Sequence, residues 1–398
     1  MSSPTNEVLY EIDKKNYLPT FNRFPIAFEK GQGSRIWDIE GKEYIDMLAG
    51  IAVNSVGHCH PKVVAAIQKQ AAELIHISNF FVSPTQVALS QKLTSLSGLE
   101  HVFLSNSGAE STEGTIKIAR KYASKHGRGG TVISMGNAFH GRTLATIATG
   151  QKKYQKGFGP MPAGFDSAPF NDFEAIREKV VDNKEIAAII VEPIQGEGGI
   201  NLADQKYLKE LRRLCDEQNI VLIFDEIQSG IGRTGKWFAK DHYGVQPDMM
   251  ALAKGLGGGV PIGAFLCSSK IAGAVDYGDH GTTFGGNPLA SAASLATLDT
   301  IATENLCTAA LENGQWFMDQ LASLQKEFPV IREVRGLGLM IGVEMGKPAA
   351  PLVKSLLNNG VVANATAGNV LRFVPALNIK RKELEEVLNR LTTCLHEF

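Results

Sequence analysis

A chain of 398 residues is too long for one simple core, so two domains are expected. Hydrophobic residues make up 44% and charged residues 20%, which is ordinary for a globular protein, and no apolar stretch reaches the ~20 residues that span a bilayer. The formal net charge of −1 gives no reason to expect nucleic acid or a membrane as a partner. Five scattered cysteines and an N-terminus without a signal-peptide or transit-peptide pattern predict a cytoplasmic protein.

The N-terminal part of the chain predicts an arm, a hairpin and a helix. Residues 1 to about 35 predict an irregular arm, and the apolar runs of Ser34–Ile51, broken at Glu40-Gly41, predict a hairpin. The sequence GHCHP at 57–61 places two histidines and a cysteine too close together to share one tetrahedral metal ion. We interpret it as a turn before a helix that Pro61 begins, since apolar residues recur at helical spacing from Val64 to Ile75.

The sequence SNSGAE joins a strand predicted at Val102–Leu104 to a helix that begins near Ala109. A helix N-terminus at the end of a strand presents backbone N–H groups that bind phosphate. Ser107 has an alternative interpretation as a plain N-cap. The junction is therefore a candidate phosphate site.

A strand predicted at Thr131–Ser134 leads into the sequence NAFHGRT. Taken alone, Phe139 in this sequence is an ordinary core residue and Arg142 is a loop arginine. Neither residue indicates a site without further context.

The next predicted strand, Ile186–Val191, is followed by EPIQGEGG, in which Glu197 taken alone is a loop acid. A helix predicted at Asp204–Gln218 then leads into a strand that begins at Val221. This strand, helix, strand order predicts a largely parallel sheet.

The stretch 221–259 carries the strongest chemical signal. Val221–Phe224 predicts a buried strand with Asp225 at its C-terminal end, the edge at which ligands bind in open α/β sheets. A second apolar run, Met249–Ala253, precedes Lys254 in a glycine-rich turn. The simpler interpretation is that Asp225 is an acid at a solvated strand end and that Lys254 is a loop lysine without a catalytic role. The alternative is a pyridoxal phosphate site, in which Lys254 forms a Schiff base with the aldehyde and Asp225 pairs with the ring nitrogen.

Two neighbours of Asp225 favour the cofactor interpretation. Gln228 can donate a hydrogen bond to a phenolate oxygen, and Ile227 can pack on a flat ring. The same stretch contains G-x-G-x-x-G at Gly230, Gly232 and Gly235, but no strand directly precedes it and no convincing amphipathic helix opens within it. A nicotinamide dinucleotide site is therefore disfavoured.

The sequences FDEIQSGIGRTG and DMMALAKGLGGGVPIGA resemble those of the class III, fold-type-I pyridoxal phosphate aminotransferases, and the nearest resemblance is to acetylornithine aminotransferases. The resemblance extends from about Phe21 to the C-terminus. It implies an α/β fold with a large, mostly parallel sheet domain at 58–290. A smaller α+β domain would combine the arm segment 1–57 with the linking helix and C-terminal part at 291–398.

The resemblance also implies a reaction, in which the terminal amino group of N2-acetylornithine passes to 2-oxoglutarate, a step of arginine biosynthesis. Other ω-amine donors remain alternatives, namely 4-aminobutyrate, ornithine, succinylornithine and N-succinyldiaminopimelate. A non-catalytic relative is a further alternative, against which the intact set of Asp225, Gln228 and Lys254 argues.

By resemblance, Lys254 and Asp225 are the catalytic residues of a homodimer with shared active sites. The other implied contacts with the cofactor are Ser107, Gly108, Ala109, Phe139, Ile227, Gln228 and, across the dimer interface, Thr283. The implied contacts with the substrate are Arg142, Glu197, Thr282, Arg372 and Phe21.

Four of these positions carry particular implications. Arg142 would hold a substrate carboxylate, and Glu197 would pair with Arg372 until glutamate binds. A tyrosine often stands where this chain has Phe21, so the resemblance implies an acylated donor, although Phe21 has an alternative interpretation as packing in the arm.

One departure from the family pattern is Ser111-Thr112 in place of the usual Ala-Asn, for which we expect altered packing and an intact phosphate site.

Overall fold

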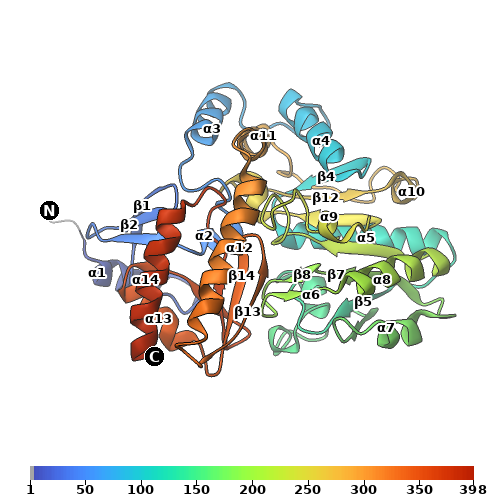
Figure 1. Cartoon of the computed structure of the whole chain (residues 1–398). Helices are drawn as coiled ribbons and strands as arrows, with labels where there is room; N and C mark the ends of the chain where they lie inside the picture. The colour runs from blue at the N-terminus through green and yellow to red at the C-terminus, as the bar shows by residue number, and fades with distance from the viewer. Residues whose placement is uncertain (1–3) are drawn as a thin grey trace.

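The computed structural model describes residues 4–398, and its largest element is a seven-stranded sheet (Figure 1). The strand order is β4-β12-β11-β10-β7-β5-β6. Neighbours from β11 to β6 pair in parallel, whereas β12 runs antiparallel to both β11 and β4. The predicted mostly parallel sheet is therefore confirmed. Its strands are β4 (His101–Ser105), β5 (Thr131–Met135), β6 (Phe165–Ala168), β7 (Ile186–Val191), β10 (Val221–Asp225), β11 (Met249–Leu252) and β12 (Gly263–Cys267).

Helices cover both faces of this sheet because its central strands are apolar on both sides. In β10, Val221 and Ile223 pack against α5 (Gly108–Lys125), whereas Leu222 and Phe224 pack on the side of α8 (Gln205–Gln218). Burial of each such side chain contributes roughly 1.5–3 kcal/mol. The other helices of this part are α3 (Pro61–Glu73), α4 (Pro84–Ser97), α6 (Leu144–Ala148), α7 (Phe173–Val180), α9 (Lys240–Tyr243) and α10 (Ser269–Ala272), with 3-10 turns η1 (Lys152–Tyr154) and η2 (Lys254–Gly257).

Two smaller four-stranded sheets lie beside the large one (Figure 1). The first contains β1 (Phe28–Gln32), β2 (Arg35–Asp38), β3 (Glu43–Asp46) and β15 (Val361–Val362). The second contains β13 (Ile331–Leu337), β14 (Met340–Met345), β17 (Val370–Phe373) and β16 (Asn364–Thr366), and a separate hairpin is formed by β8 (Ile194–Gln195) and β9 (Asn201–Leu202). The pairing of β15 with β3 places residues from both ends of the chain in one sheet, and the domains at 1–57, 58–290 and 291–398 stay predictions.

The helices of the terminal segments differ from the predictions in two places. The arm predicted to be irregular contains α1 (Asn6–Asn16), a polar helix with no buried residue, whose N-terminus is capped by Thr5. The linking helix predicted after residue 290 is two helices, α11 (Pro288–Thr303) and α12 (Leu306–Leu324), because Asn305 between them has a φ of +53°. The remaining helices are α2 (Ala49–Ala52), α13 (Ala350–Asn358) and α14 (Arg381–Glu397).

The predicted turn at 57–61 is confirmed, since α3 begins at Pro61, although it ends at Glu73, before Ile75. His58 pairs with Asp46, and His60 lies 3.3 Å from a carboxylate oxygen of Glu304. Within residues 4–398 no cluster of histidine, cysteine or acidic side chains has the arrangement of a metal site. The helices of that same range include none with the length and apolar character needed to cross a bilayer.

Candidate active site

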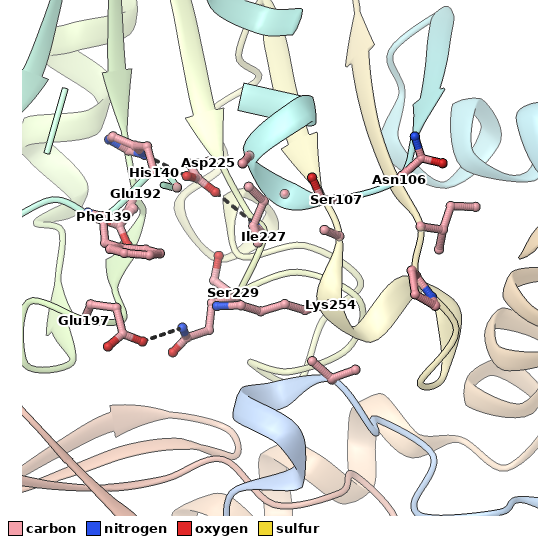
Figure 2. A pocket seen from close by; sticks show the side chains of 18 of the residues that line it. Asn106, Ser107, Phe139, His140, Glu192, Glu197, Asp225, Ile227, Ser229 and Lys254 are labelled. Atoms are coloured by element: carbon pink, nitrogen blue, oxygen red, sulfur yellow. Dashed lines mark hydrogen bonds and ion pairs between the residues drawn. The ribbon is translucent and has the colours of Figure 1, made fainter. Parts of the chain in front are cut away.

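A cavity of about 350 Å³ lies at the C-terminal edge of the parallel strands (Figure 2). Side chains from several of the predicted positions line it and project into one space. The predicted residues in its lining are Ser107, Gly108, Ala109, Phe139, Glu197, Asp225, Ile227, Gln228 and Lys254.

Lys254 enters this cavity from the turn that follows β11. Its own φ is +43°, and the turn continues through Gly258 and Gly259, whose φ values of +58° and +111° favour glycine. Burial lowers the pKa of the Lys254 ammonium to about 8. The neutral amine, which is the nucleophilic form, is therefore a larger minority near neutral pH than it is for an ordinary lysine.

Asp225 lies at the end of β10 and is held in one orientation by two hydrogen bonds. The backbone N–H of Ile227 donates to Oδ1 at 3.0 Å, and His140 Nδ1 donates to Oδ2 at 2.7 Å (Figure 2). Burial alone would lower the pKa of His140, but the hydrogen bond to Asp225 outweighs it and the pKa is raised. The carboxylate is thus fixed at the strand edge beside a buried histidine.

His140 and Glu192 are site residues that sequence reasoning missed. Glu192 accepts hydrogen bonds from the backbone N–H groups of Phe139, at 3.1 Å, and Gly196, at 3.2 Å, and its burial raises its pKa. Strands β5 and β10 both adjoin β7, so the loop that follows β5 brings His140 next to Asp225. The signal available in the sequence was a histidine directly after Phe139 in a loop at this sheet edge.

The N-terminus of α5 faces the cavity through Ser107, Gly108 and Ala109. Ser107 is the N-cap and accepts a hydrogen bond from the N–H of Glu110 at 3.2 Å. A Cβ on Gly108 would lie 3.0 Å from the side chain of Ile227, so a larger residue here would require Ile227 to shift. The departure at Ser111-Thr112 is a packing difference, because the Ser111 hydroxyl lies buried, 3.0 Å from the Leu252 carbonyl oxygen to which it donates.

Glu197, which lines the cavity, forms an ion pair with the buried Arg372. Nη1 of Arg372 lies 2.5 Å from Oε1 of Glu197, and the arginine side chain is fully buried. The same Nη1 donates to Oε1 of Gln228 at 3.2 Å, and Nε donates to Oδ1 of Asn364 at 3.1 Å. Burial would raise the pKa of Glu197, but attraction to Arg372 holds it below its usual value. The predicted anionic partner of Arg372 is therefore a carboxylate of this chain.

Arg142 lies beside the cavity, outside its lining. Its guanidinium stacks over Tyr154, 4.1 Å from the ring centroid, and lies 5.6 Å from that of Phe139. Among residues 4–398 no carboxylate lies within ion-pairing distance of Arg142. Its guanidinium therefore has no acidic partner in this part of the chain.

Three further predicted residues lie outside the lining of the cavity in their own chain. Thr282 reaches its rim, where its hydroxyl accepts a hydrogen bond from Asn106 at 3.2 Å. Thr283 is exposed, and Phe21 is 69% exposed on the arm. The roles predicted for Thr283 and Phe21 therefore stay predictions that a single chain does not test.

The residues present fit pyridoxal phosphate. The α5 N-terminus suits the phosphate, and Phe139 and Ile227 suit a flat ring. Asp225 and Lys254 supply the carboxylate and the amine that the ring nitrogen and the aldehyde require. The turns around Gly230 and Gly232 contain no helix, so this segment lacks the strand–turn–helix form that the dinucleotide motif requires.

Comparison with known proteins gives the same assignment. The family model described as Aminotransferase class-III matches residues 18–395. An acetylornithine aminotransferase from Methanocaldococcus jannaschii is 53% identical over 391 residues, which cover 98% of each chain.

Two solved structures extend the comparison. The ornithine aminotransferase from Toxoplasma gondii has a TM-score of 0.95 at 36% identity, covering 100% of this chain and 96% of that one. The acetylornithine aminotransferase from Elizabethkingia anophelis has a TM-score of 0.89 at 34% identity and full coverage of both chains, 100% each. The chain belongs to the class III aminotransferases, enzymes that depend on pyridoxal phosphate.

Proposed function

We propose that the enzyme transfers the terminal amino group of N2-acetylornithine to 2-oxoglutarate, giving N-acetylglutamate 5-semialdehyde and glutamate, a step of arginine biosynthesis. The names of the curated relatives support this substrate. The observation that carries the proposal is the buried pair of Glu197 and Arg372 beside Lys254. This pair suits a site that must accept two donors with different charges near the reacting amine.

The two donors make opposite demands on Arg372. The terminal amine of acetylornithine has no charged group next to it, so an unpaired Arg372 would be a buried, uncompensated charge. Glutamate has its α-carboxylate beside the reacting amine and needs that arginine. A Glu197 that pairs with Arg372 for the first donor and releases it for the second satisfies both demands.

Lys254 is the proposed catalytic base. Bound pyridoxal phosphate supplies an aldehyde that links to amines and a ring that draws electrons from the adjacent carbon. Nζ of Lys254, whose pKa burial lowers to about 8, can take a proton from the substrate carbon and return one during the exchange.

Asp225 is proposed to hold the proton on the ring nitrogen. The hydrogen bonds from His140 and from the N–H of Ile227 keep its carboxylate in one orientation. Asp225 and His140 are buried and shielded from water. The attraction between the Asp225 carboxylate and the protonated ring nitrogen would therefore be stronger than in water. The α5 N-terminus would bind the phosphate through the amides of Gly108 and Ala109.

Arg142 is proposed to bind the carboxylate of the donor that is remote from the reacting amine. Its planar fork can donate two parallel hydrogen bonds, and stacking on Tyr154 fixes its orientation. Thr282, at the rim, is proposed to lie beside the same substrate.

A homodimer with shared active sites is also proposed. Exposed Thr283 is the residue that would reach the cofactor phosphate of the partner subunit. Several large apolar side chains near it support an interface, among them Phe80, Phe81 and Phe284, which are 94%, 63% and 61% exposed. We further propose a cytoplasmic location, for which the scattered free cysteines are the support.

A substrate panel with 2-oxoglutarate as acceptor tests the proposal. The donors are acetylornithine, ornithine, 4-aminobutyrate, succinylornithine and N-succinyldiaminopimelate, and acetylornithine should have the highest kcat/KM. Ornithine is the competing candidate because the Toxoplasma gondii structure with a TM-score of 0.95 is an ornithine aminotransferase. Equal efficiency on ornithine, or faster turnover of 4-aminobutyrate, would reject acetylornithine as the substrate. No turnover of any donor would indicate a non-catalytic relative.

A further inference from the structure

The backbone that carries Glu197 is held by the small sheet of β13, β14, β17 and β16. Glu197 lies in the loop at 196–200 between β8 and β9. The Thr366 hydroxyl, on β16, donates to the carbonyl oxygen of Glu197 at 2.6 Å. Because Thr366 is only 5% exposed, water does not compete for this hydrogen bond.

Arg335, on β13, binds the same loop at Gly199 and Ile200, two and three residues after Glu197. Its Nη2 donates to the carbonyl oxygen of Gly199 at 2.7 Å, and its Nε–H is shared between the carbonyl oxygens of Gly199, at 3.1 Å, and Ile200, at 3.2 Å. Its Nη1 lies 2.6 Å from carboxylate oxygens of both Glu333 and Glu344. These two acids occupy one edge of the guanidinium and turn the other edge toward the loop.

The sheet that holds the loop also carries Arg372. In the pairing of β16 with β17, Asn364 lies opposite Arg372 and Thr366 lies opposite Val370. Both the charge that Glu197 binds and the donors to its loop therefore belong to one sheet. These hydrogen bonds hold the backbone of Glu197 beside Arg372.

We propose that Thr366 and Arg335 are positioning residues, which hold the Glu197 backbone so that only its side chain moves between pairing with Arg372 and releasing it. This inference rests on the proposed function, because it assigns the two residues to the exchange between acetylornithine and glutamate. Neither residue lines the cavity, so neither is a catalytic residue.

The test is Thr366→Val, which keeps the shape of the side chain and removes the hydroxyl. A less restrained loop pairs Glu197 with Arg372 for less of the time, which disfavours acetylornithine and favours glutamate. The ratio of kcat/KM for glutamate to kcat/KM for acetylornithine should rise about threefold to tenfold, the size expected from one lost hydrogen bond. The ratio is independent of the folded fraction of a preparation, because both substrates are assayed on the same enzyme.

A binding measurement provides a second readout. Glutarate is an unreactive dicarboxylate, and calorimetry on the holoenzyme should give it a dissociation constant lower by a similar factor in Thr366→Val, since Arg372 is more often free. Thr366→Ser retains the hydroxyl and should restore the wild-type ratio. The matched control is Thr300→Val, which removes a buried hydroxyl that bonds to Ala296 within α11 and should leave the ratio unchanged.

Arg335→Met is the second variant, and its ratio should move in the same direction. Unchanged ratios and unchanged glutarate binding in Thr366→Val and Arg335→Met, together with a shifted ratio in Glu197→Gln, would overturn the positioning role and leave the proposed function in place. A failure of the proposed function is distinct, since the wild-type enzyme itself would then fail to use acetylornithine.

Discussion

Replacing Glu197 with glutamine tests the proposed switch directly, because Glu197→Gln keeps the shape of the side chain and removes its charge. The amide oxygen of glutamine can still accept a hydrogen bond from Arg372. The acceptors of Gln228, at 3.2 Å, and Asn364, at 3.1 Å, also remain. The kinetics of Glu197→Gln therefore report the loss of the negative charge that neutralises Arg372, because the packing around Arg372 is retained.

The size of the effect follows from the burial of the pair. Arg372 is fully buried and Glu197 is 23% exposed, so loss of the carboxylate leaves a buried, uncompensated charge. Breaking a buried pair in this way typically costs about 3–5 kcal/mol. The remaining neutral acceptors and the partial exposure of Glu197 reduce this, and we expect a net effect of about 1.4–2.8 kcal/mol, which corresponds to tenfold to a hundredfold.

The assay measures the two half-reactions separately in a stopped-flow spectrometer. Acetylornithine is mixed with the aldehyde form of the enzyme, and glutamate is mixed with the same form. The ratio of kcat/KM for glutamate to that for acetylornithine should rise by the factor given above. Binding of glutarate should tighten in parallel, because the arginine is no longer occupied.

An equal loss on both half-reactions would contradict the switch and would assign Glu197 a general structural role. A loss confined to glutamate would contradict it more strongly, because the carboxylate would then assist the donor that it is proposed to hinder. Glu185→Gln provides the control, since this exposed glutamate at the start of β7 lies outside the cavity lining.

Four further predictions follow from the site. Lys254→Met should lose about 10²–10⁴-fold in turnover, the contribution of a positioned proton-transfer group, while absorbance still detects non-covalently bound cofactor; near-normal transamination would refute the role of Lys254. Burial lowers the pKa of Lys254 to about 8 from its usual 10.5, so the folded, cofactor-free protein carries an unfavourable ammonium below pH 8. Calorimetry on that cofactor-free protein should therefore find Lys254→Met more stable than wild type below pH 8, with the gain disappearing as the pH rises from 8 to 10.5; a pH-independent difference would refute this. Cofactor affinity should fall when the enzyme is diluted to monomers, and sedimentation of a fully active monomer would count against shared sites. Wild type should prefer acetylornithine over ornithine by at least about tenfold in kcat/KM, and Phe21→Tyr should narrow that gap; an unaltered gap would place Phe21 outside the site.

Local sequence patterns predicted the strands β4, β5, β7 and β10 and the helices α3, α5 and α8, whereas β6, β12 and the remaining helices around the large sheet were not predicted. The apolar run before Asp225 and the helical spacing in Gln205–Gln218 each reflect a periodicity that burial imposes on neighbouring residues. The helix α1 was missed for the same reason. None of its residues is buried, so no apolar periodicity marks it, and it is held by its Thr5 cap and by polar contacts such as the hydrogen bond from the Ala27 N–H to the Asn6 side chain.

The general place of the site was predictable because the C-terminal ends of parallel strands share one edge of the sheet. The individual contacts were not. His140 and Asp225 are 85 residues apart, and their contact depends on the strand order, in which β7 lies between β5 and β10. Periodicity within a segment carries no information about which strands are neighbours.

Arg372 and Arg233 illustrate the limit of reasoning from burial. A buried charge needs a polar or charged partner, and Arg372 has the carboxylate of Glu197. Arg233 is equally buried, yet it donates to the carbonyl oxygens of Leu339, at 3.0 Å, and Pro375, and no acid of residues 4–398 pairs with it. Burial lowers its pKa to about 9, whereas the carboxylate of Glu197 compensates the charge of Arg372. A buried arginine in a sequence therefore predicts a polar partner of some kind. Arg372 differs from Arg233 in that it pairs with a carboxylate that lines the cavity, which places its charge beside the substrate, whereas Arg233 joins two parts of the fold.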